Sequence, residues 1–125
     1  MWYKKLREKY SNDYNAGCDL GWRLIEGRQY NSAAQVFQGL LAVKRDYETL
    51  YLYGYALAWA NKKYDAEKYL REATVLDPTD YRAFYSLGYV YCDTGRPAEA
   101  RTAWQAVLKL MPHFPEIENR LKSLK

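Results

Sequence analysis

A chain of 125 residues is long enough to bury one hydrophobic core and too short for two independent ones. Its 49% apolar content excludes a disordered chain, and its most apolar stretch, residues 50–60, has about half the length of a membrane-spanning helix. The net charge of +4 comes mainly from residues 1–10, because residues 11–112 carry equal numbers of acidic and basic side chains. We interpret this excess as a solvated helix face, with an acidic partner at the N-terminus as the alternative. No nucleic-acid partner is expected.

The first predicted element is a charged amphipathic helix within residues 1–12. Tyr3 precedes Phe37 by 34 residues, and Leu6 precedes Leu40 by the same distance. Residues 37–40 belong to the second helix of a repeated unit described below, so residues 1–12 are predicted to be a matching half-repeat without its first helix. This half-repeat is either a native capping helix or part of a longer array that was cut.

A repeat runs through the rest of the chain, marked by Gly21, Gly54 and Gly88 at spacings of 33 and 34 residues. An alanine follows each glycine after twelve residues, and a large apolar residue follows each alanine after four. A period near 34 is typical of stacked supersecondary units. The alanines are Ala33, Ala66 and Ala100, and the large residues are Phe37, Leu70 and Trp104.

Each unit is predicted to contain two amphipathic helices, because its apolar residues recur at spacings of three and four. Short turns join the two helices, at Gly27 and Arg28 in the first unit and at Gly95 and Arg96 in the third. The repeated glycines should lie where helices approach closely, with Ala100 opposite Gly88. The predicted units are residues 14–46, 47–80 and 81–114, followed by a C-terminal capping helix at residues 115–125.

The residues at these positions resemble the tetratricopeptide repeat. The third unit carries the pattern most fully, whereas the first has Gly17 at the first large position and Arg45 in place of the proline. The resemblance implies an all-α, right-handed superhelix of three helix-turn-helix repeats with flanking capping helices. The repeat residues of the third unit are Phe84-x2-Leu87-Gly88-x2-Tyr91, then Ala100-x3-Trp104, then Pro112.

The first helix of each unit has an unusually aromatic face opposite its core-facing stripe. At about 100° per residue, Trp22, Tyr55 and Tyr89 form one column on this face. The resemblance implies that this face lines a concave groove, and Tyr and Trp suit peptide recognition. The alternative is that the flanking tyrosines fill space between units. The predicted groove residues are Trp22, Tyr51, Tyr55, Trp59, Tyr85 and Tyr89, with Glu26, Glu48, Arg82 and Asp93 as charges.

Two known ligand classes of the family can be compared with these positions. Tetratricopeptide domains that bind the acidic tails of chaperones use a clamp of Lys, Asn and Arg, and here only Arg82 fits that clamp. We therefore do not expect this ligand. Residues 34–40 and the three-unit length also resemble chaperones of type III secretion translocators, although the extra N-terminal helical segment of those proteins is missing.

Nothing in the sequence predicts an enzyme, a cofactor or a metal site. The single histidine, His113, stands in a turn beside Pro112, and no nucleotide-binding or metal-binding motif occurs. Cys18 and Cys92 lie in different units, too far apart for a disulfide, and the first residues do not resemble a signal peptide. We expect a cytoplasmic adaptor or chaperone-like module that binds an extended peptide without entering a membrane. The alternative is a piece of a longer solenoid, or a homo-oligomer whose aromatic face is covered by another chain.

Overall fold

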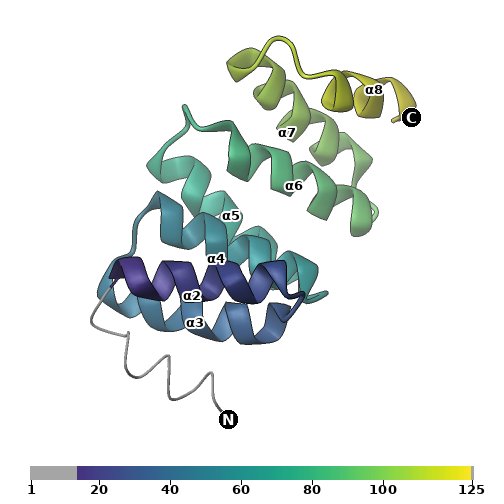
Figure 1. Cartoon of the computed structure of the whole chain (residues 1–125). Coiled ribbons are helices and arrows are strands. Elements are labelled where there is room, and N and C mark those ends of the chain that lie inside the picture. Colours follow the sequence, from purple (N-terminus) through teal and green to yellow (C-terminus); the bar gives the residue numbers. More distant parts are fainter. Residues whose placement is uncertain (1–13, 125) are drawn as a thin grey trace.

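The computed structural model describes residues 14–124, which form a stack of helical hairpins (Figure 1). The all-α prediction is confirmed, while the predicted half-repeat at residues 1–12 lies outside the described residues and the unit boundaries remain predictions. Helices α2–α3, α4–α5 and α6–α7 pair as successive hairpins, and α8 packs beside the last of them. The helices are α2 (Tyr14–Glu26), α3 (Tyr30–Val43), α4 (Tyr47–Trp59), α5 (Lys63–Leu76), α6 (Tyr81–Asp93), α7 (Pro97–Leu110) and α8 (Pro115–Ser123).

The core of each hairpin forms where a large side chain from the second helix packs on the periodic glycine of the first. A Cβ atom at Gly88 would lie 1.8 Å from Nε1 of Trp104, and one at Gly21 would lie 2.5 Å from the ring of Phe37. The predicted close approach is therefore present. That Ala100 lies opposite Gly88 stays a prediction, since the three atoms nearest that position all belong to Trp104, one helical turn further along α7.

The turn inside each hairpin contains one residue with a left-handed backbone. These residues are Arg28, Asn61 and Gly95, with φ of 60°, 65° and 73°. In each case the next N–H donates to a carbonyl five residues earlier, which is the Schellman motif that ends a helix. The three hydrogen bonds run from Gln29 to Leu24 (2.8 Å), Lys62 to Leu57 (2.9 Å) and Arg96 to Tyr91 (2.8 Å).

Exchanging residues at this turn position should change stability in opposite directions. Arg28→Gly removes a side chain from a left-handed backbone and should raise the free energy of unfolding by about 0.5–1 kcal/mol. Gly95→Ala introduces that strain and should lower it by about 1 kcal/mol, since its Cβ would meet no atom within 4 Å and steric overlap plays no part. Urea unfolding followed by circular dichroism measures both. A stabilising Gly95→Ala would contradict this explanation.

The second and third hairpins are joined by a hydrogen-bonded junction. The Tyr47 hydroxyl donates to Oδ1 of Asp80 at 2.9 Å and accepts from the N–H of Ala83 at 3.1 Å. Asp80 also caps α6 by accepting from the N–H of Arg82, as Asp46 caps α4 through Thr49. This junction fixes α6 relative to α4, and these two helices form the site described next.

Candidate functional site

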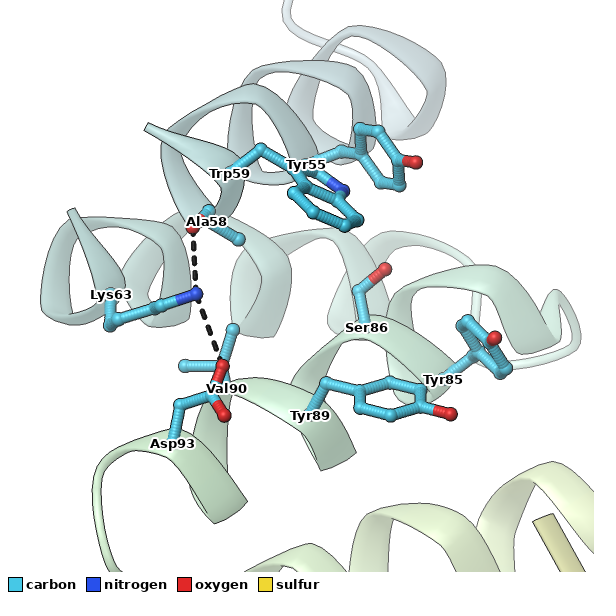
Figure 2. A pocket seen from close by; sticks show the side chains of 9 residues that line it. All are labelled: Tyr55, Ala58, Trp59, Lys63, Tyr85, Ser86, Tyr89, Val90 and Asp93. Atoms are coloured by element: carbon cyan, nitrogen blue, oxygen red, sulfur yellow. Dashed lines mark hydrogen bonds and ion pairs between the residues drawn. The ribbon is translucent and has the colours of Figure 1, made fainter. Parts of the chain in front are cut away.

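A hollow of about 350 Å³ lies between α4 and α6 (Figure 2). Aromatic side chains from both helices form its walls, and one ion pair closes an end. The volume is near the lower limit of small-molecule pockets, so the hollow has room for one or two large side chains. Its lining residues are Tyr55, Ala58, Trp59, Lys63, Tyr85, Ser86, Tyr89, Val90 and Asp93.

The α4 wall of the hollow is made by Tyr55 and Trp59, one helical turn apart. Their ring centroids are 6.3 Å apart, and Trp22 of α2 lies 6.3 Å from Tyr55 on the other side. Trp59 stacks on Tyr30 at 5.5 Å, yet 58% of its surface is exposed. Because Tyr30 stacks on the indole and restricts it, Trp59 offers an ordered apolar surface, and binding costs little further entropy.

The α6 wall is made by Tyr85 and Tyr89, which meet edge to face at 5.2 Å. Both hydroxyls donate to the Glu116 carboxylate of α8, with a distance of 2.6 Å for Tyr85. Tyr89 also meets the ring of Trp104 at 5.2 Å. Tyr89, predicted on the face opposite the core-facing stripe, therefore also packs against the core, because the small Gly88 beside it brings Trp104 up to α6.

The two tyrosines and Glu116 shift one another's pKa values. The hydrogen bonds from Tyr85 and Tyr89 lower the pKa of Glu116, because they stabilise its charged form. Burial, together with the negative charge of Glu116, raises the pKa of both hydroxyls. At neutral pH the carboxylate is therefore ionised and the hydroxyls keep their protons, so α8 holds the α6 wall in position.

Acid should weaken this contact between α8 and α6. The folded-state pKa of Glu116 lies below its unfolded value of about 4.3, so its stabilisation is complete above that pH and is lost as the pH falls through the folded-state pKa. At pH 6, Glu116→Gln should lower the free energy of unfolding by about 1 kcal/mol. At pH 3 the difference should shrink, as urea unfolding at both pH values would show. An equal difference at both would contradict the role of the ionised carboxylate.

An ion pair closes the hollow at the end where α4 meets α5. Nζ of Lys63 lies 3.1 Å from Oδ2 of Asp93 and donates to the carbonyl of Ala58 at 2.8 Å (Figure 2). Asp93 was among the expected charges, but Lys63 was missed. The available signal was its place as the first residue of α5, directly after the turn, which brings it beside the end of α4.

A second charged cluster lies at the opposite end of α4 and α6. Arg82 donates to Glu48 at 2.7 Å and to Asp80 at 3.0 Å, and its guanidinium carbon lies 4.9 Å from the centroid of Tyr51. Burial raises the pKa of Tyr51 to about 12. These contacts link adjacent hairpins. None of the residues in this cluster lines the hollow, and they lie beside it: Glu48, Tyr51 and Arg82.

Family models of the tetratricopeptide repeat match residues 18–80 and residues 81–114. The chain belongs to the tetratricopeptide repeat family. Comparison with curated protein sequences gives no match. Tetratricopeptide repeats form a protein-interaction scaffold, so this chain is a protein-interaction module of a generally non-enzymatic family.

Solved tetratricopeptide structures share the fold. The crystal structure of MamA superposes with a TM-score of 0.86 at 23% identity, over 95% of this chain and 70% of that one. The first repeat domain of Spaghetti (RPAP3), bound to the HSP90 peptide SRMEEVD, gives 0.83 at 18% identity, over 90% and 92%. The Yersinia enterocolitica type III secretion translocator chaperone SycD gives 0.80 at 20%, over 88% and 86%. The predicted tetratricopeptide solenoid and its likeness to translocator chaperones are thus confirmed at the level of fold.

Four of the six predicted groove aromatics meet in the hollow of this tetratricopeptide domain, namely Tyr55, Trp59, Tyr85 and Tyr89. Trp22 adjoins them through Tyr55. Their role in binding stays a prediction. Within residues 14–124, no three His, Cys, Asp or Glu side chains are grouped to hold a metal ion. Over the same residues, no helix has the length and apolarity to cross a membrane.

Proposed function

We propose that this tetratricopeptide domain binds an extended segment of a partner protein across α2, α4 and α6, with one large side chain inserted in the hollow. The observation that carries the proposal is Trp59, a large aromatic residue that is 58% exposed at the wall of a concave site. Exposed aromatic side chains with few rotatable bonds are typical anchors of interfaces. The proposal includes the cytoplasm as the setting expected from the sequence.

Three features of the site support peptide binding. The aromatic surface extends from Trp22 on α2, which is 44% exposed, through Tyr55 to Trp59. Its side chains are already ordered by neighbours, because Tyr30 stacks on Trp59 and Glu116 accepts a hydrogen bond from Tyr85. Little conformational entropy is therefore lost on binding. The hollow is too small for a folded domain and large enough for a side chain. The RPAP3 structure shows a peptide on a domain of the same fold.

The proposal can be tested without knowing the natural partner. A library of random twelve-residue peptides displayed on phage is panned on the whole chain, and each selected peptide is titrated into the isotope-labelled protein. We expect the amide signals of α4 and α6 around the hollow to shift most, with little change along the outer face of α5. Shifts confined to α5 and α7, or no selected peptide at all, would contradict peptide binding at this face.

The alternative, in which a second copy of the chain covers the aromatic face, has a different signature. Sedimentation equilibrium of the whole chain should show a monomer if the face is kept for another protein. Association that depends on concentration and disappears in Trp59→Ala would instead favour the self-associating scaffold.

A further inference from the structure

The ion pairs beside the hollow expose their acidic partners more than their basic ones. In the pair at the closed end, the side chain of Asp93 is 52% exposed and that of Lys63 is 25% exposed. In the pair at the other end, Glu48 is 44% exposed and Arg82 is 34% exposed. Asp80, the second partner of Arg82, is more buried because it caps α6. An incoming ligand therefore meets carboxylate oxygens first.

In two ion pairs of α5, the basic partner is the more exposed one. Arg71 is 65% exposed and its partner Glu67 is 12% exposed, and Arg45 is likewise more exposed than Glu72 of α5. The pair of Arg96 and Glu99 is an exception, because there the acidic partner is the more exposed one. The two pairs beside the hollow and these two pairs on α5 thus differ in which partner is the more exposed.

Two cations beside the hollow, Lys63 and Arg82, are already neutralised, whereas Arg120 of α8 lies 5.2 Å from the centroid of the Tyr89 ring. Lys63 is held by Asp93 and by the carbonyl of Ala58, and Arg82 is held by Glu48 and Asp80. An acidic ligand at Lys63 or Arg82 would have to displace these carboxylates, and the displaced groups would repel it. A third acid, Glu26 of α2, is exposed at the repeat position shared by Trp59 and Asp93.

We propose that the occupant of the hollow is a basic peptide segment, with one large apolar side chain in the hollow and a Lys or Arg within reach of the bordering carboxylates. This inference rests on the proposed function and names the chemistry of its partner. The cation gains from Asp93, Glu26 or Glu48 and from the aromatic faces of Trp59 and Tyr55. Such charge complementarity sets specificity and association rate.

The composition of the selected phage peptides tests this inference. The library should offer Lys and Arg as often as Asp and Glu, and only peptides that lose binding to Trp59→Ala are scored. We expect these peptides to be net positive and to contain one large apolar residue. Net acidic or neutral peptides that still depend on Trp59 would overturn the inference and leave the proposed function intact. Peptides that bind without depending on Trp59, or no binding peptides, would overturn both.

A charge reversal on the protein gives an independent test with a matched control. Glu26→Lys should weaken binding of a selected basic peptide about three- to fivefold at low salt, with the difference shrinking as salt is added. Asp65→Lys makes the same change at an exposed residue of α5 that does not line the hollow, and should leave affinity within about twofold. Circular dichroism confirms that both variants fold. Equal losses in the two variants, or tighter binding to Glu26→Lys, would overturn the inference.

Discussion

Gly88→Ala should destabilise the domain by about 3 kcal/mol, the largest effect expected from adding a single methyl group to it. The added Cβ would lie 1.8 Å from Nε1 of Trp104, and that side chain is 1% exposed in a close-packed interior. The indole N–H donates to the carbonyl of Tyr85 at 3.3 Å, and moving the ring also breaks this bond. Alanine's advantage of about 1 kcal/mol as a helix former is too small to offset these losses.

Gly27→Ala is the matched control for this substitution. Its Cβ would meet its nearest atom, the carbonyl oxygen of Arg23, at 3.5 Å, which is an ordinary contact, and its backbone is not left-handed. Its free energy of unfolding should stay within about 0.5 kcal/mol of the unmodified chain. Urea unfolding of both variants provides the comparison, and equal losses would contradict the packing described.

A double-mutant cycle isolates the contact between Gly88 and Trp104. Trp104→Ala alone should cost about 3–5 kcal/mol. Adding Gly88→Ala in that background should cost little more, because the side chain that blocks the methyl group is gone. Should Gly88→Ala cost as much without the indole as with it, the destabilisation would arise elsewhere.

The helical repeat was predictable because its signals are local and periodic. Gly21, Gly54 and Gly88 mark the period, and apolar spacing of three and four marks each helix. The aromatic column was predictable for the same reason, since Tyr55 and Tyr89 follow from helix geometry once the core stripe is known. The three left-handed turn residues also recur with the repeat, and Gly95 and Asn61 are residue types that favour this backbone, whereas Arg28 is not.

The partners of the site residues could not be predicted, because they come from elements that the repeat pattern does not relate. Glu116 reaches Tyr85 and Tyr89 from α8, and Lys63 of the second hairpin reaches Asp93 of the third. These contacts depend on how successive hairpins rotate against each other and on side-chain rotamers. The packing of the Trp104 ring on Gly88 likewise depends on its side-chain rotamer, which periodicity alone leaves open.

Truncating the most exposed aromatic of the hollow should abolish most of the binding while leaving the fold intact. Trp59 is 58% exposed and forms a wall of the hollow with Tyr55, so Trp59→Ala removes a large anchor and little of the core. A central aromatic anchor contributes about 2 kcal/mol or more, which corresponds to about a 30-fold loss of affinity. Thermal unfolding should change by only a few degrees.

Tyr64→Ala is the control for the loss of an exposed aromatic ring. Tyr64 is 71% exposed on α5 and does not line the hollow, so its removal should leave affinity within about twofold. The decisive measurement is calorimetric titration of one phage-selected peptide into the unmodified chain, Trp59→Ala and Tyr64→Ala. Binding that is about 30-fold weaker in Trp59→Ala alone is the predicted result. Unchanged affinity in Trp59→Ala, or an equal loss in Tyr64→Ala, would contradict a binding site in this hollow.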